Sequence, residues 1–210
     1  MLTCAPRCDM TVVARESGIS LFEVNKPQTM KSQDFRVSIS ECAPATEALS
    51  LRMPRADDGP RVHSLIASSP PLDVNSPYCN LLQCTDFRET CILAERGDAL
   101  LGWVSAYRPP RSPDELFIWQ VAIACAARGE GLALKMLDAL LERSAVAGVR
   151  ALVTTITEDN EASWGLCRSF ARRHGATLTT SPRFERQAHF GGAHDTEWEA
   201  RIAPLPALSK

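Results

Sequence analysis

The stretch from Leu116 to Ser144 constrains the fold of this 210-residue chain more than any other part of the sequence. Apolar and β-prone residues from Leu116 to Ile123 predict a buried strand. The segment that follows repeats apolar residues at helical spacing, namely Leu132, Met136, Leu137, Leu140 and Leu141. Gly129 and Gly131 therefore lie at the junction between a strand and a helix.

This junction has the properties of an anion-binding site. Glycine has no Cβ, so a ligand can approach the backbone closely, and the first turn of a helix has unpaired N–H groups and a positive dipole end. The combination suits a phosphate or pyrophosphate. A P-loop would need Gly-Lys-Ser/Thr at the turn, and a dinucleotide fingerprint would need a third glycine; the sequence has neither. An ordinary glycine-containing turn is the remaining alternative.

Composition favours a single globular domain with extensions. Hydrophobic residues make up 45% and charged residues 23%, which is ordinary for a soluble protein. We expect a flexible N-terminal extension over 1–48, a single folded domain over 49–205 and a short tail over 206–210. The N-terminus has no apolar run long enough for a signal peptide or membrane helix. A net charge of −2 with scattered basic residues argues against nucleic-acid and membrane partners.

The cysteines predict reduced thiols and a cytoplasmic protein. Eight cysteines are present with no CxxC pair, and several have apolar neighbours. The four histidines, His63, His174, His189 and His194, are not spaced with the cysteines in a zinc pattern. We therefore expect no metal.

The order of elements predicts an α/β fold with a mixed central sheet. A short strand near residue 51 and a helix through residue 66, capped by Asp57 or Asp58, come first. A hairpin follows over 90–95 and 100–107, and the central strand and helix come next. A strand over 151–157, a helix capped by Asp159 or Asn160, and a final hairpin over 177–202 complete the chain. A strand-helix-strand crossover between hairpins implies helices on both faces of the sheet.

A proline-stiffened loop over 70–77 is a candidate substrate-binding segment. Its prolines restrict the backbone, while Asp73, Asn75 and Tyr78 place polar groups on or beside it. Loops on rigid backbone often carry function. A plain connector between helices, with Asp73 capping a turn, is the alternative.

The pattern Arg-x-x-Gly-x-Ala, formed by Arg128, Gly131 and Ala133, resembles the acetyl-CoA pyrophosphate loop of the GNAT N-acetyltransferases. The element order is also that of the GNAT acyl-CoA N-acyltransferase fold. The resemblance implies acetyl-CoA as co-substrate, with backbone contacts from the central strand to its pantetheine arm. The implied cofactor-binding set is Val121, Ala122, Ile123, Arg128, Gly129, Gly131, Leu132, Ala133, Asn160 and Ser163.

Longer segments resemble one family within this superfamily, the L-2,4-diaminobutyrate acetyltransferases. The similarity covers about residues 50 to 204 and is carried by the runs 70–76, 78–82, 116–122, 154–157 with Asn160, and 189–197. It implies transfer of acetyl from acetyl-CoA to the γ-amine of L-2,4-diaminobutyrate, in ectoine biosynthesis. A transferase of the same fold for another amine and a non-catalytic acetyl-CoA sensor are the alternatives.

The chemistry of such a transfer sets requirements of its own. An alkylamine with a pKa of about 10.4 is only about one part in a thousand neutral at pH 7.4, so reaching the nucleophilic form costs roughly 4 kcal/mol. The enzyme must therefore help to remove a proton, directly or through water. A backbone N–H of Val121 or Ile123 can stabilise the thioester oxygen as charge develops there.

A diamine that also has a carboxylate needs anionic groups for its ammonium groups. Asp73 and Glu197 are the candidates for that role, and Trp119 can supply an apolar wall or a cation–π surface. Turn capping for Asp73, a strand-face charge for Glu197 and plain core packing for Trp119 are the alternatives. The predicted substrate-binding set is Asp73, Asn75, Tyr78, Trp119, Thr155 and Glu197, and the catalytic set is Val121, Ile123, Tyr78 and His194.

The helix after Asn160 departs from the usual GNAT pattern. Many GNAT enzymes have a tyrosine there that protonates the leaving thiolate, and Cys167 occupies that position in this chain. Cys167, Tyr78 or water could donate the proton, or the thiolate could leave unprotonated, since a thiol pKa is about 8.5. An exposed strand in the tail makes a homodimer the expected assembly.

Overall fold

The computed structural model describes residues 47–70 and 72–206. Most of the predicted extension and residues 207–210 of the predicted tail lie outside this range. The strands are β1 Leu49–Arg52, β2 Ile92–Arg96, β3 Ala99–Tyr107, β4 Glu115–Ile123, β5 Ala151–Thr157, β6 Thr177–Phe184 and β7 Glu197–Ala203. The helices are α1 Gly59–Ala67, α2 Pro77–Thr85, α3 Leu132–Leu141, α4 Glu161–His174 and α5 Arg186–Phe190. Short 3₁₀ turns are η1 Ala56–Asp58, η2 Arg88–Thr90, η3 Cys125–Ala127 and η4 Ser144–Val146.

The described strands form a seven-stranded sheet in the order β1-β2-β3-β4-β5-β7-β6. Neighbouring strands are antiparallel except for β4 and β5, which are parallel. A parallel pair needs a long crossover, and α3 lies in the connection between these two strands. The predicted mixed sheet is confirmed.

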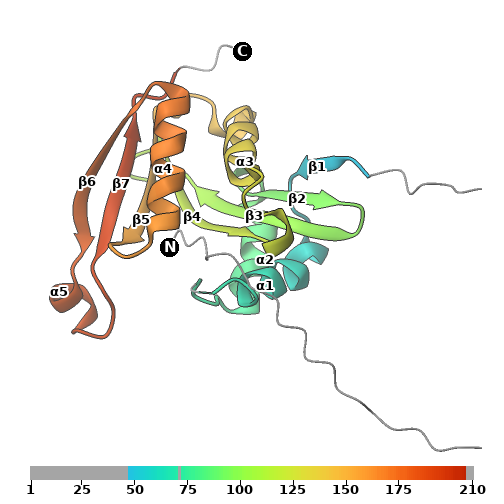
Figure 1. The fold of residues 1–210 in the computed structure, drawn as a ribbon, viewed down its shortest axis with the longest axis horizontal. Coiled ribbons are helices and arrows are strands. Elements are labelled where there is room, and N and C mark those ends of the chain that lie inside the picture. Colours follow the sequence, from blue (N-terminus) through green and yellow to red (C-terminus); the bar gives the residue numbers. More distant parts are fainter. Residues whose placement is uncertain (1–46, 71, 207–210) are drawn as a thin grey trace, which may run out of the picture. The chain divides into compact units, whose positions relative to one another are not determined.

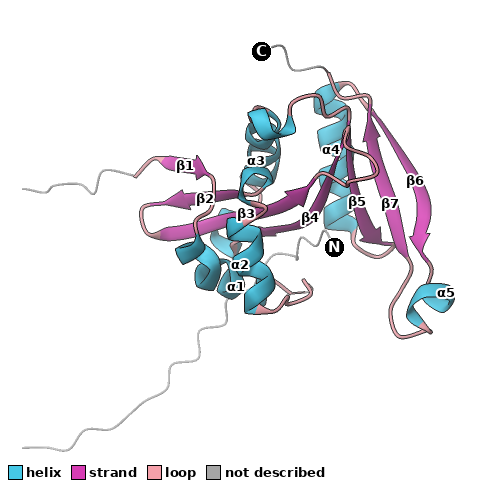
Figure 2. Ribbon diagram, turned by 180° about the vertical axis from the view of Figure 1, so that it is seen from behind, coloured by secondary structure: helices cyan, strands magenta, loops and turns pink. Residues whose placement is uncertain are grey.

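Helices cover both faces of the sheet, as predicted. Figures 1 and 2 show α1 and α2 on one side of β2, β3 and β4, and α3 on the other. The largest core lies between the sheet and helices α3 and α4, where Met136 and Phe170 are fully buried. A second core lies under α1, where Ile66 packs with Trp103. Burial of apolar area on both faces holds these three layers together.

Strands β4 and β5 pair over only part of their length. Their register joins residues 115–117 to residues 151–153 and goes no further. Just beyond the last pair, the Thr154 hydroxyl donates to the carbonyl of Ile118 at 2.9 Å. The remainder of β4 is therefore paired with β3 alone, and a gap opens between β4 and β5.

Strand β4 contains a bulge at Trp119. The register with β3 pairs Ser105 with Gln120 and then Ala106 with Ile118, so it skips Trp119. A bulge rotates the strand and redirects its side chains. After it, Val121 and Ile123 face the core under α3, while Gln120 stays buried on the same face of the sheet as Trp119.

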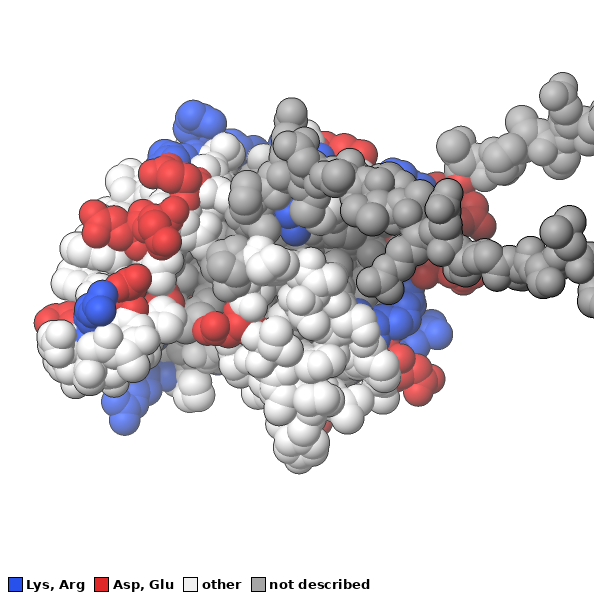
Figure 3. All heavy atoms as spheres, turned by 60° about the horizontal axis from the view of Figure 1, so that its bottom comes forward, with Lys and Arg blue, Asp and Glu red and all other residues white. Residues whose placement is uncertain are grey.

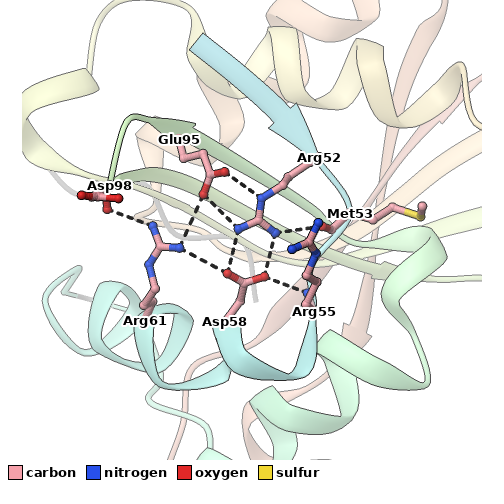
Figure 4. Close-up of polar contacts among 7 residues, drawn as sticks. All are labelled: Arg52, Met53, Arg55, Asp58, Arg61, Glu95 and Asp98. Atoms are coloured by element: carbon pink, nitrogen blue, oxygen red, sulfur yellow. Dashed lines mark hydrogen bonds and ion pairs between the residues drawn. The ribbon is translucent and has the colours of Figure 1, made fainter. Parts of the chain in front are cut away.

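A cluster of charged side chains fastens β1 to the start of α1 (Figure 4). Arg52 makes two hydrogen bonds to Asp58, at 2.7 and 2.8 Å, and two to Glu95 on β2, at 2.7 and 2.9 Å. Asp58 also accepts from the backbone N–H of Arg55, and Arg61 completes the cluster. The predicted capping of α1 by an aspartate side chain is therefore wrong: Asp58 occupies the N-cap position, but its carboxylate is used by Arg52 and Arg55.

The C-terminal third follows the prediction with two refinements. Asn160 caps α4 by accepting from Ser163 N–H at 3.1 Å, and Gly175, with φ of 61°, ends that helix. The final hairpin is confirmed as β6 and β7. The loop between them contains α5, which was not predicted because five residues are too few to show a helical period.

Charges are mixed on the described part of the surface. On the face in Figure 3, basic and acidic side chains are scattered among uncharged ones. Within residues 47–70 and 72–206, no helix has the length and apolar character needed to cross a membrane. The same residues include no group of three or more His, Cys, Asp or Glu side chains that could hold a metal ion.

Candidate active site

The glycine turn before α3 has the geometry of an anion cradle. Gly129 and Gly131 have φ of 82° and 72°, and Gly131 is the N-cap of α3 without any side-chain cap. A Cβ built on either glycine would meet no atom within 4 Å. The space in front of the first helical turn is therefore open, and the N–H groups of that turn face it. A diphosphate would fit this site.

The backbone of β4 presents two N–H groups to the gap between β4 and β5. Ala124 N–H donates to the Leu101 carbonyl at 2.9 Å, so it points toward β3. Donor directions alternate along an antiparallel ladder. The N–H groups of Val121 and Ile123 therefore point away from β3 into the gap, whereas Ala122 faces β3. The two predicted oxyanion donors thus lie on the open side of the strand.

The other predicted cofactor residues surround this gap. Arg128 turns back to β4, where its Nε donates to the Ile123 carbonyl at 3.0 Å. The Leu132 side chain is buried in the main core, so this residue can offer only its backbone. Asn160 and Ser163 form the capped start of α4, directly after β5. The N-termini of both α3 and α4 therefore flank the gap.

Cys167 is not placed to act as a proton donor. Its side chain is 2% exposed and packs in the main core. Burial raises the pKa of this thiol to about 12. A thiol that holds its proton so tightly is a poor acid toward a thiolate, whose conjugate acid has a pKa of about 8.5. Tyr78, the other side-chain donor considered, is 68% exposed on α2 and does not line the pocket described below.

A pocket of about 630 Å³ reaches the point where β4 and β5 separate. Trp119 contributes from β4 and Thr155 from β5, each one residue beyond the Ile118–Thr154 hydrogen bond. Three predicted substrate residues, Trp119, Thr155 and Glu197, meet in this pocket. The complete lining is Phe87, Tyr107, Phe117, Trp119, Thr155, Phe184, His189, Phe190 and Glu197.

Glu197 is the single acidic residue in that lining. It begins β7 opposite Thr157, is 2% exposed, and has an Oε2 with no hydrogen-bond partner among the described residues. Its Oε1 lies 4.0 Å from Nε2 of His194. Nδ1 of His194 lies 2.8 Å from the carbonyl of Asp195, which can only accept, so Nδ1 carries a proton and Nε2 faces the carboxylate.

The proline-stiffened loop is attached to β4 beside the pocket. Gln120 Nε2 donates to the Asp73 carbonyl at 2.9 Å, and Asn75 Nδ2 donates to Gln120 Oε1 at 2.7 Å. The Asp73 side chain itself is exposed, and neither Asp73 nor Asn75 lines the pocket. The structure thus places this loop next to Trp119 through a residue that the sequence analysis did not single out.

Gln120 and the aromatic walls were missed by sequence reasoning. Gln120 had one available signal, since it is the polar residue inside an otherwise apolar strand. The residues of the walls are far apart in the chain, and an isolated aromatic residue gives no signal in the sequence that it lines a pocket. They are Phe87, Tyr107, Phe117, Phe184 and Phe190, and ring contacts join Tyr107 to Phe87, Phe117 and Trp119.

Comparison with known proteins agrees with this geometry. The model of the acetyltransferase (GNAT) family matches residues 60–171. L-2,4-diaminobutyric acid acetyltransferases from Methylotuvimicrobium alcaliphilum and Vibrio cholerae are 43% and 48% identical to this chain. These matches cover 78% and 72% of this chain and 95% and 87% of the relatives.

Solved structures give the same result. Diaminobutyrate acetyltransferase EctA from Paenibacillus lautus, in complex with L-2,4-diaminobutyric acid and coenzyme A, is 37% identical, with a TM-score of 0.72. The match covers 75% of this chain and 96% of that one. Ard1 from Thermoplasma volcanium, at 16% identity, a TM-score of 0.58 and coverage of 76% and 99%, shares the fold. The chain belongs to the acetyltransferase (GNAT) family and, within it, to the L-2,4-diaminobutyric acid acetyltransferases.

Proposed function

We propose that this chain, through residues 49–205, transfers acetyl from acetyl-CoA to the γ-amine of L-2,4-diaminobutyrate. The product is N4-acetyl-L-2,4-diaminobutyrate, an intermediate of ectoine biosynthesis. The observation that carries the proposal is the buried Glu197 carboxylate, which faces an aromatic pocket that ends at the β4–β5 gap. A buried carboxylate with an unsatisfied oxygen among aromatic rings is a site for an ammonium group.

The residues around the gap fit acetyl-CoA. The open turn at Gly129 and Gly131 and the start of α3 receive the pyrophosphate. The N–H groups of Val121 and Ile123 lie where the pantetheine arm and the thioester oxygen would run along β4. When bound, acetyl-CoA supplies the acetyl carbon that the amine attacks. The chain's own contribution is to hold that carbon in the gap, beside the pocket, and to stabilise the developing oxygen charge.

Glu197 and His194 take up the proton of the reacting amine. The buried carboxylate attracts the ammonium form and accepts one proton from it, which leaves a neutral amine whose lone pair attacks the acetyl carbon. His194 Nε2, 4.0 Å from Glu197 and partly open to solvent, receives the proton next and passes it to water. The nitrogen then loses its second proton, to water or to the departing thiolate, as the carbon–sulfur bond breaks. Asp73, on the loop anchored to Gln120, is the candidate for the second ammonium group, and Trp119 forms the wall between them.

The leaving sulfur does not require a dedicated acid. Cys167 is in the core and Tyr78 is outside the pocket lining. Neither of these two candidate proton donors is therefore placed to protonate the sulfur. A thiolate is a stable leaving group because its conjugate acid has a pKa of about 8.5. It leaves as the anion or takes its proton from water or from the attacking nitrogen.

A thiol-release assay with L-2,4-diaminobutyrate, putrescine and lysine tests the proposal. We expect turnover of diaminobutyrate at a kcat/KM at least tenfold above the other two amines. Faster turnover of putrescine would indicate a different amine as the substrate. Binding of acetyl-CoA without thiol release from any amine would indicate a sensor.

The proton role of Glu197 has a matched control on the same strand. Glu197→Gln should lower kcat/KM for diaminobutyrate by about a hundredfold or more, the usual range for a lost general base, and leave the KM for acetyl-CoA unchanged. Glu199→Gln, which removes a partly exposed carboxylate paired with Arg183, should change neither value more than about threefold. Equal effects of both substitutions would remove Glu197 from the mechanism.

We also propose a cytoplasmic homodimer. The described cysteines are all free thiols, which fits a reducing compartment. Strand β6 is an eight-residue edge strand with mostly exposed side chains, and an edge of that length is a template for pairing. Light scattering on the purified protein should give twice the monomer mass of 23.0 kDa.

A further inference from the structure

The pocket has an anion for the substrate's ammonium but no cationic side chain for its carboxylate. The lining contains the carboxylate of Glu197 and six Phe, Tyr or Trp side chains, and it includes no Lys or Arg. A carboxylate that leaves water needs hydrogen-bond donors. The lining donors that can be considered are Tyr107 O–H, Trp119 Nε1–H, Thr155 O–H and one nitrogen of His189.

The hydrogen-bonding of His189 determines which of its nitrogens is the donor. The backbone N–H of Glu185 donates to Nδ1 of His189 at 2.9 Å, so Nδ1 must be an acceptor. In a neutral imidazole the proton then resides on Nε2. Edge contact with Phe184, at 5.8 Å between ring centroids, also fixes the ring plane. No residue within 47–70 and 72–206 forms a hydrogen bond with Nε2, so His189 presents an oriented N–H at the pocket.

The position of His189 suits the end of the substrate that does not react. The γ-amine must reach the β4–β5 gap, where Trp119 and the nearly buried Thr155 lie. The α-carboxylate lies at the other end of the molecule and must stay far from Glu197. His189 is on α5, outside the sheet, and is solvent-exposed. It therefore lies at the outer part of the pocket, where a carboxylate keeps part of its hydration.

We infer that the Nε2–H of His189 binds the substrate's α-carboxylate and makes the enzyme select amino acids over plain diamines. The inference rests on the proposed function and adds a specificity residue to it. The hydrogen bond is charge-assisted, and such bonds contribute about ten- to a hundredfold in affinity. His189 takes no part in the bond-making step, so kcat at saturation should change little.

The test compares L-2,4-diaminobutyrate with 1,3-diaminopropane, which is the same molecule without the carboxylate. His189→Phe keeps the ring and its contact with Phe184 but removes the donor. We expect its KM for diaminobutyrate to rise about ten- to a hundredfold, while the KM or the competitive inhibition constant of 1,3-diaminopropane stays within about twofold. His189→Gln, which can place an amide N–H near the position of Nε2, should recover most of the loss.

Two rival donors are measured in the same assay. Tyr107→Phe removes the phenol of the pocket wall. Arg183→Gln removes the guanidinium that lies 5.0 Å from the Phe117 ring and pairs with Glu199. In each of these two variants, the KM for diaminobutyrate and the KM for 1,3-diaminopropane should change by the same factor. The inference would be overturned if one of these variants raised the KM for diaminobutyrate alone while His189→Phe kept the wild-type KM. The carboxylate would then be assigned to Tyr107 or Arg183.

The remaining outcomes separate this inference from the proposed function. An equal loss of both amines in His189→Phe would mean that His189 only shapes the pocket, which overturns the inference while wild-type turnover of diaminobutyrate upholds the function. No thiol release by the wild type with diaminobutyrate would overturn the proposed function, and this inference with it.

Discussion

Gln120 Nε2 donates to the backbone carbonyl of Asp73 at 2.9 Å, which joins the central strand to the proline-stiffened loop. The contact depends on the bulge at Trp119, because the bulge puts Trp119 and Gln120 on the same face of β4. One irregular residue in the strand therefore directs both a pocket wall and the anchor of the neighbouring loop. Gln120 is 1% exposed, and both polar atoms of its amide bond to residues of this loop.

Gln120→Leu should release the loop without damaging the acetyl-CoA site. It removes the hydrogen bonds to Asp73 and Asn75 while keeping the volume of the side chain. We expect the KM for diaminobutyrate to rise about tenfold and the KM for acetyl-CoA to stay unchanged in steady-state kinetics. Gln83→Leu is the matched control, because it removes another buried glutamine, on α2, which accepts from Asn80 and does not line the pocket. A KM change of equal size in both variants would contradict the anchoring role.

Gly131→Val should disable the cradle for the pyrophosphate. The φ of 72° is a left-handed conformation that costs a β-branched residue about 1–2 kcal/mol, and the added side chain would enter the open space before α3. We expect the KM for acetyl-CoA to rise at least tenfold, with a modest fall in melting temperature.

The control for the cradle is Gly165→Ala on α4. Gly165 is helical and a Cβ there would also meet no atom within 4 Å, so this substitution should leave kinetics unchanged and stabilise the helix by up to about 1 kcal/mol. If Gly131→Val stays folded and binds acetyl-CoA normally, the turn is not the pyrophosphate site.

The parts of the fold that repeat a local pattern could be predicted from the sequence. The strand before Gly129 and the amphipathic helix after Gly131 each have a period, and a crossover between hairpins leaves few topologies. Trp119, Thr155 and Glu197 could be singled out because they lie in segments that resemble the family, and the sheet order then brings them into one pocket.

The rest of the site depends on contacts that no local pattern encodes. The bulge at Trp119 shifts the alternation of β4 by one residue, so a strict period of two assigns Gln120 to the wrong face. Asp58 looks like a helix cap in sequence, but Arg52, six residues earlier, takes up its carboxylate. Cys167 occupies the position of a family tyrosine, yet its side chain is buried in the core between the sheet and helices α3 and α4.

Asp58→Asn should make the domain less stable at neutral pH and less sensitive to acid. Hydrogen bonds from Arg52 hold the pKa of Asp58, and of Glu95, below their usual values. A carboxylate with a lowered folded pKa stabilises the fold above the unfolded value of about 3.9, and this stability is lost as the pH falls. We expect a loss of about 1.5–3 kcal/mol at pH 7, measured by urea unfolding, that shrinks toward pH 3.

Asp57→Asn is the control for that measurement. Asp57 is the exposed neighbour of Asp58 and lies outside the cluster in Figure 4. Its substitution should change the free energy of unfolding by less than about 0.5 kcal/mol at either pH. If Asp58→Asn behaves the same way, the cluster does not stabilise the attachment of β1.

The buried thiol of Cys167 should make the protein less stable in alkali. Burial raises its pKa to about 12 in the folded state, whereas an unfolded thiol titrates near pH 8.5. Above that value the unfolded chain loses a proton that the folded chain keeps, so the free energy of unfolding falls with rising pH, by up to about 1.4 kcal/mol per pH unit. Cys167→Ala removes this term, and its unfolding free energy should fall less steeply than that of the wild type between about pH 9 and 11.

Ser169→Ala, on the same helix, is the control, because it removes a group that does not titrate and should keep the wild-type slope. Parallel slopes for Cys167→Ala and the wild type in urea titrations would show that the thiol ionises equally in both states, contrary to its burial in the core.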